Sequence, residues 1–167
     1  MQAQDQRFKV GDKAVYPAQG VAEVISIQEK EIAGNAMEFY VLRLLDTDQT
    51  IMVPIARAGA VGLRRPISEK DVRKIFVILK QDGQPHDPQV WSRRYRGFIE
   101  KLKTGTVFDV AEAMRDLYRL QLEKDLSYVE RRMLDTARKL IVKEIAVARS
   151  RSPEQVQMDI DAIFQTN

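Results

Sequence analysis

The sequence predicts an α+β protein, with a small β-barrel or strongly bent sheet at the N-terminus followed by a compact all-α region of about five helices. Up to Pro66, short segments rich in β-branched residues alternate with period two between turn residues. After Pro66 the apolar residues recur with the 3.6-residue period of amphipathic helices. Little flexible linker sequence separates the two patterns. We therefore expect two domains, residues 1–66 and residues 67–167.

Five short strands with no helix between them are expected in the first domain, a pattern typical of a small barrel or a strongly bent sheet. The clearest segments are rich in β-branched and aromatic residues, and they are Lys13–Tyr16, Val21–Ile27, Glu38–Leu45 and Thr50–Val53. Pro54 stops the last segment, and because proline cannot donate to a further ladder, an edge strand is expected there. The alternative, that this strand closes the barrel, remains open.

Five helices are expected in the second domain, each beginning at a residue whose side chain can accept from the first-turn backbone N–H groups. The expected N-caps are Ser68, Asp87, Thr106, Ser127 and Ser152. The second helix has Pro88 at its first position, where a missing N–H costs nothing, and it extends to about Lys103. Apolar residues at helical spacing give each helix one face for a shared core.

Charge is distributed unevenly along the chain. Residues 1–66 hold eight basic and eight acidic side chains, whereas residues 67–167 hold nineteen basic and sixteen acidic ones. The segment from Trp91 to Lys103 alone contains five Lys or Arg residues and one acid. Such a local excess points to a patch with an anionic partner. A solvated helix face explains the charges equally well.

Trp91, the only tryptophan, stands at the head of this basic segment. A large flat apolar side chain can push between bases and stabilise unstacked DNA, while neighbouring cations hold phosphates. A structural role fits the same spacing, since Trp91, Tyr95, Phe98 and Leu102 recur at helical intervals and form a core stripe. Periodicity alone favours the core role, and both interpretations remain open.

Residue types that carry catalysis are scarce. The chain has no cysteine and one histidine, so thiol chemistry and clustered metal ligands are not expected. Neither a phosphate-binding glycine loop nor a nucleophile elbow is present. We therefore expect no enzyme activity, no cofactor and no metal. Because neither a long apolar run nor a signal peptide is evident, a cytoplasmic protein is expected.

Several stretches of the chain together form a recognisable pattern. The first is Phe8–Pro17, followed by Gly20 and Val21. The others are Ile51–Pro54, Val61–Arg64, Trp91–Arg96, Glu100–Leu102, Ala111–Tyr118, Asp125–Ser127 and Glu130–Leu134. This set resembles the CarD/CdnL transcription regulators, whose N-terminal module is shared with the transcription-repair coupling factor. The resemblance covers nearly the whole chain in order, and it is closest to the CdnL branch, which lacks the extra DNA-binding tail of the long CarD form.

The resemblance implies that residues 1–66 form a Tudor-like or SH3-like module that binds the RNA polymerase β subunit. The implied contact residues are Lys30, Thr50, Ile51, Met52, Val53 and Pro54. Some family members have arginine where this chain has Lys30 and Met52, so charge-pair contacts there are partly replaced by a more apolar one. An exposed edge strand could accept a partner strand by β-augmentation.

The resemblance also implies that residues 67–167 contact promoter DNA. Trp91 would be a wedge in the minor groove at the upstream edge of the melted promoter. The implied DNA-contact residues are Trp91, Arg93, Arg94, Arg96, Ile99 and Lys103. Ile99 stands where the CdnL branch carries a methionine.

The function expected from these contacts is regulation of transcription initiation. The protein would stabilise the promoter open complex without sequence-specific recognition, as a monomer associated with the nucleoid through RNA polymerase. Minor-groove and backbone contacts carry little base information, which agrees with this expectation. The alternative is a protein–protein adaptor that recruits a further partner to RNA polymerase.

Overall fold

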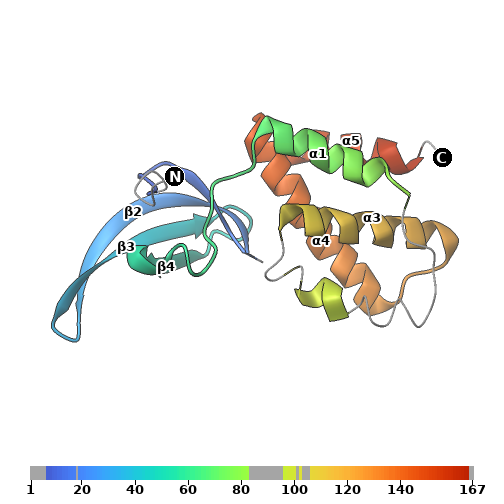
Figure 1. Cartoon of the computed structure of the whole chain (residues 1–167). Coiled ribbons are helices and arrows are strands. Elements are labelled where there is room, and N and C mark those ends of the chain that lie inside the picture. Colours follow the sequence, from blue (N-terminus) through green and yellow to red (C-terminus); the bar gives the residue numbers. More distant parts are fainter. Residues whose placement is uncertain (1–6, 18, 83–95, 101, 103–105, 166–167) are drawn as a thin grey trace. The chain divides into compact units, whose positions relative to one another are not determined.

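The computed structural model describes residues 7–17, 19–82, 96–100, 102 and 106–165. The chain divides into two compact units, Met1–Pro66 and Ile67–Asn167. The first unit is a curled antiparallel sheet and the second is helical, so the predicted α+β class is confirmed (Figure 1). The division falls where the sequence changes its hydrophobic period.

Four strands form the sheet of the first unit in the order β1-β2-β3-β4, and every pair is antiparallel. They are β1 (Lys13–Tyr16), β2 (Gly20–Ile32), β3 (Asn35–Leu44) and β4 (Thr50–Pro54), followed by the 3-10 helix η2 (Ile55–Arg57). The sequence led us to expect five strands. In place of a fifth, Arg64 forms one isolated bridge with Val15, whose backbone N–H donates to the Arg64 carbonyl at 2.7 Å.

The β2–β3 hairpin is longer than the sequence predicts, because pairing continues to Ile32 opposite Asn35. Its turn consists of Ala33 and Gly34, with φ of 52° and 81°. Two consecutive positive φ values belong to the mirror-image turns whose twist matches that of paired strands. The prediction stopped β2 at Ile27, because the next four residues are polar or charged. Here the backbone ladder continues despite the low strand propensity of those residues.

The core of the first unit lies on the inner face of the curled sheet. It consists of Phe8, Ala14, Ala22, Val24, Tyr40, Leu42, Leu44, Val53 and Leu63. The backbone N–H of Phe8 donates to the Tyr40 hydroxyl at 2.9 Å, and the two rings meet edge to face with centroids 5.7 Å apart. This contact ties the segment before β1 to the middle of β3.

The helices of the second unit are α1 (Glu69–Lys80), α3 (Val107–Glu123), α4 (Tyr128–Arg149) and α5 (Pro153–Gln165). Residues 96–100 and 102 are also helical, and they fall within the second predicted helix. The predicted caps Ser68, Thr106, Ser127 and Ser152 each accept a hydrogen bond from a first-turn backbone N–H. The predicted cap Asp87 lies outside the described residues.

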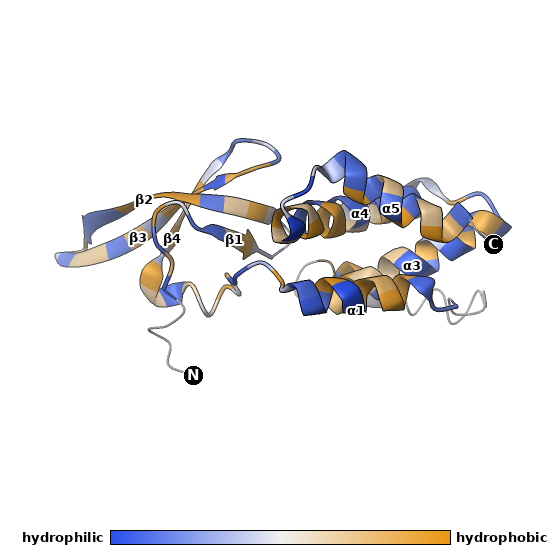
Figure 2. Cartoon of the chain, turned by 90° about the horizontal axis from the view of Figure 1, so that it is seen from above, coloured by the Kyte–Doolittle hydropathy of each residue, from blue (hydrophilic) through white to orange (hydrophobic). Residues whose placement is uncertain are grey.

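The helices pack around one apolar core. Figure 2 shows that hydrophobic and hydrophilic stretches alternate along the helices. Phe98, at 2% exposure, joins this core from the short helical segment. At the start of α1, Glu69 accepts two hydrogen bonds of 2.9 Å from Arg149, the last residue of α4. This pair joins the beginning of α1 to the end of α4.

Candidate partner-binding surfaces

The strand β4 lies at the edge of the sheet, as predicted. It pairs with β3 on one side, with Met52 opposite Val41. Within the described part of the chain, no backbone hydrogen bond joins the other side of β4 to a further strand. The prediction of an edge strand is therefore confirmed, and β4 does not close a barrel. An open edge of this kind can pair with a strand of another protein.

Side chains along β4 alternate between the two faces of the sheet, as the period of a strand requires. Val53 is buried at 3% exposure in the core, and Ile51 packs against the same core. Thr50 and Met52 are exposed. Of the predicted polymerase contacts in this strand, Ile51 and Val53 therefore point inward, and only their backbone groups face the open edge.

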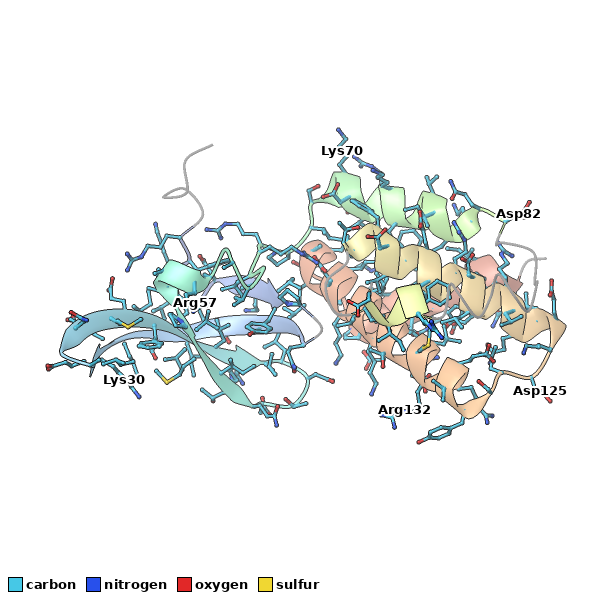
Figure 3. All side chains as sticks on the ribbon, turned by 60° about the horizontal axis from the view of Figure 1, so that its bottom comes forward. Lys30, Arg57, Lys70, Asp82, Asp125 and Arg132 are labelled. Carbon is cyan, nitrogen blue, oxygen red and sulfur yellow. The ribbon has the colours of Figure 1, made fainter. Side chains whose placement is uncertain are left out.

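The register brings Lys30 to the same outer face as Met52. Lys30 pairs with Met37, and Met52 pairs with Val41, so both lie opposite β3 residues of one parity. The β3 side chains on the opposite face, which include Leu42, belong to the inner core. Figure 3 shows Lys30 on the β2–β3 hairpin. The β3 partners of these two residues, Met37 and Val41, are four residues apart. At about 3.4 Å per residue, Lys30 and Met52 therefore lie about 14 Å apart along the strand direction.

The outer face includes apolar residues that are not among the contacts expected from the sequence. Phe39 and Val41 belong to the outer parity of β3, yet their exposures are only 8% and 5%. Phe39 pairs with Gln28 and Pro54, and Val41 pairs with Ser26 and Met52. The sequence carried a signal for this surface, because β3 has apolar residues on both of its faces. A strand with one solvated face would alternate instead.

The described part of the predicted DNA-contact segment separates its polar and apolar residues. Arg96 is exposed, whereas Phe98 is buried in the helical core. Ile99 is half-buried, and Leu102 packs against the core. The other predicted DNA contacts, Trp91, Arg93, Arg94 and Lys103, lie outside the described residues.

Ile99 and Leu102 line one side of a groove of about 310 Å³. The other side is formed by the first turns of α4, through Tyr128, Val129, Arg132, Met133 and Thr136. Tyr128 and Val129 are 67% and 45% exposed. Ile99 was among the residues expected from the sequence, whereas the residues of the α4 side were not. Apolar residues directly after the Ser127 cap were the available signal, since first-turn positions are often polar.

The described residues include no cluster of three or more His, Cys, Asp or Glu side chains that could hold a metal ion. None of the helices that the structure describes is long and apolar enough to cross a membrane.

Comparison with known proteins matches both units to one family. Residues 8–67 match the family model described as the CarD-like/TRCF RID domain, and residues 74–161 match the CarD C-terminal domain. The RID domain implies interaction with RNA polymerase. The observed curled sheet followed by helices agrees with a Tudor-like N-terminal module and a helical domain.

Individual relatives are bacterial. The chain is 31% identical over 150 residues to YdeB of Bacillus subtilis (strain 168), a protein named as a transcription factor, and the match covers 90% of this chain and 97% of the relative. The solved structure of CdnLNt from Myxococcus xanthus shares 55% identity over 41% of this chain and 93% of its own, with a TM-score of 0.34. The N-terminal domain of Myxococcus xanthus CarD shares 38% identity over 36% of this chain and 80% of its own, with a TM-score of 0.32.

Proteins of this family are regulators of transcription and not enzymes. Both units match the family's domain models, and the Bacillus relative is matched over nearly its whole length. The chain therefore belongs to the CarD/CdnL family of transcription regulators.

Proposed function

We propose that this protein binds the RNA polymerase β subunit through its sheet and stabilises the promoter open complex through its helical unit, without sequence-specific DNA recognition. The observation that carries this proposal is that Lys30, Thr50 and Met52 share one outer face of a sheet whose last strand, β4, has an open edge. Both features are available to a partner without any change in the inner core.

The polymerase contact would combine backbone and side-chain recognition. The open side of β4 supplies unpaired N–H and C=O groups for a partner strand, and alternate side chains give specificity. Met52 offers an apolar contact with 37% exposure, while Lys30 offers a cation on the same face. Thr50 and Pro54 flank Met52 on the outer parity, which supports one continuous contact along β4.

The DNA contact would combine a wedge with cations. Trp91 would insert at the upstream edge of the bubble, and Arg93, Arg94, Arg96 and Lys103 would hold backbone phosphates. Support comes from Arg96, which is exposed on the helical segment whose Phe98 is buried in the core. This segment therefore presents a cation to solvent while its apolar side holds it to the unit.

The two contacts would depend on each other. A handful of cations gives weak, salt-sensitive and non-specific affinity for free duplex. Binding to polymerase would raise the effective concentration of the helical unit at the promoter, which converts a weak contact into a productive one. The free protein is accordingly expected to give no sequence-specific footprint at physiological salt.

The decisive experiment is the lifetime of open complexes formed by polymerase with the wild-type protein, with Trp91→Ala and with Met52→Glu. Both variants should shorten the lifetime, Met52→Glu by releasing the protein from polymerase and Trp91→Ala while polymerase binding persists. An exposed wedge should leave the free energy of unfolding within about 0.5 kcal/mol of wild type. A core tryptophan would instead cost about 3–5 kcal/mol on truncation, and that result with an unchanged lifetime effect would reject the wedge.

A further inference from the structure

The groove between the short helical segment and α4 is apolar, open and bordered by an exposed aromatic ring. Ile99, Leu102 and Met133 supply its apolar lining, and Tyr128 and Val129 stand at its rim. Its volume of about 310 Å³ falls at the lower end of the range for small-ligand sites. A single planar group is small enough for a site of this size.

The capping box of α4 holds the rim in place. The Ser127 backbone N–H donates to Glu130 Oε1 at 2.8 Å, and the Glu130 N–H donates to Ser127 Oγ at 3.2 Å. Glu130 is buried at 5% exposure, which anchors the first turn from inside the unit. Tyr128 and Val129 follow the cap directly, so this turn presents both side chains to solvent. A rim fixed in this way is a preorganised platform.

Arg132 gives the rim a positive side. Its guanidinium lies 5.8 Å from the centroid of the Tyr128 ring, and its Nη1 donates to the Tyr128 hydroxyl at 3.4 Å. Figure 3 shows Arg132 on the outer side of α4, directed away from the helical core. An aromatic ring beside an arginine is the combination on which unpaired bases stack.

The charge around the groove favours an anionic occupant. Arg132 lines the groove itself, and helical spacing places the exposed Lys139 farther along the same face of α4. The nearby carboxylate of Asp135 is already paired with Arg138 at 2.8 Å. On the other wall, Arg96 is exposed one turn before Ile99. Arg132 lines the apolar slot on one side and Arg96 stands one turn from it on the other, beside the exposed acid Glu100, and this arrangement suits a base with its phosphates better than an apolar peptide.

We propose that this groove receives an unpaired base of the melted promoter strand, stacked on Tyr128, with Arg132 facing the strand's phosphates. The inference rests on the proposed function, and it identifies a second base contact besides the Trp91 wedge. Stacking tolerates any base, so the contact preserves the lack of sequence specificity.

The test uses a forked promoter DNA with 2-aminopurine in its single-stranded arm next to the upstream junction, bound to polymerase and the full-length protein. The wild-type protein should quench the 2-aminopurine, since stacking lowers its emission. Tyr128→Ala should abolish the quench and weaken binding of the polymerase–protein complex to the fork by about 5- to 150-fold. Tyr128→Phe, which keeps the ring and loses only the hydroxyl, should behave as wild type.

Met158→Ala is the matched control, because Met158 is 70% exposed on α5 and does not line the groove. It should leave the quench unchanged, and thermal melts of all variants should coincide. An unchanged quench in Tyr128→Ala overturns the proposal. Weaker binding of Tyr128→Ala to polymerase without DNA also overturns it, since the occupant would then be a polypeptide.

The proposed function fails separately, if the wild-type protein does not lengthen the life of open complexes. A normal wild-type lifetime effect that Tyr128→Ala retains in full would reject the groove alone.

Discussion

In the first unit the candidate surface lies on one face of a sheet, whereas in the second it lies where a short helical segment meets α4. The sheet separates function from core by parity, since Met52 faces outward and its neighbour Val53 is 3% exposed. The helical unit separates them by rotation around a helix, as Arg96 and Phe98 show. Two adjacent residues of β4 therefore have different roles, because one side chain faces a partner and the next belongs to the core.

The largest effect on the free energy of unfolding should come from a substitution on the inner face of the sheet. Leu42 is fully buried, and Leu42→Ala should lower the free energy of unfolding by about 2–5 kcal/mol through lost burial and a cavity. Urea denaturation followed by circular dichroism measures the loss. Thr50→Ala, on the exposed parity, should stay within about 0.5 kcal/mol of wild type. Equal losses at both positions would mean that the faces are not distinct.

Substitutions of exposed residues on the outer face of the sheet should change partner binding and leave the free energy of unfolding nearly unchanged. Met52→Glu should weaken the complex with the polymerase β subunit roughly fivefold or more, because a carboxylate replaces an apolar contact. Its urea midpoint should remain close to that of wild type. Met52→Leu should retain affinity and serves as the control in a titration of the full-length protein. Full affinity of Met52→Glu would remove β4 from the proposed contact.

In the helical unit a single cation should have a smaller and salt-dependent effect. Arg96→Ala should reduce the slope of log affinity against log salt by about one, measured on the polymerase–promoter complex. Arg151→Ala is the control, because Arg151 is already paired with Asp159 at 3.5 Å. An identical slope for Arg96→Ala and wild type would argue that Arg96 contacts no phosphate.

The smallest effect should come from the ion pair that joins α1 to α4. The hydrogen bond from Arg149 lowers the pKa of the Glu69 carboxyl below its ordinary value of 4.5. When folding lowers the pKa of a carboxyl, its charged form stabilises the fold at pH values above the pKa of the unfolded state. This stabilisation is lost as the pH falls through the pKa of the folded state. Glu69→Gln should therefore melt slightly below wild type at pH 7, and the gap should close below about pH 4.5. A gap that persists in acid would assign the effect to packing instead.

Local signals allowed much of the fold to be predicted. The caps at Ser68, Thr106 and Ser127 were readable because each acts through the backbone only three residues away. The far half of the β2–β3 hairpin was missed because its polar residues have low strand propensity, while the Ala33–Gly34 turn and the backbone ladder carry the pairing. Propensity is a weak guide when the backbone alone provides the contacts.

The candidate surfaces were less accessible to sequence reasoning. Ile99 was selected because it stands where the CdnL branch carries a methionine, but the groove that it lines also needs Tyr128 and Arg132 from another helix. Nothing in local periodicity brings those residues together. The edge position of β4 was predicted from Pro54, whereas the shared face of Lys30 and Met52 emerged only from the register of three strands. The role of Trp91 stays a prediction.

The strand order of the sheet also bears on how fast the first unit folds. Each strand pairs with its neighbour in the sequence, so each pairing closes only a short loop of chain. The bridge between Val15 and Arg64 instead joins segments roughly fifty residues apart, whose closure costs more entropy. We expect the β2–β3 ladder to form first and the Val15–Arg64 bridge last. Pulse-labelled hydrogen exchange during refolding should accordingly protect the hairpin amides before those of Val15 and Arg64, which lock the curl of the finished sheet.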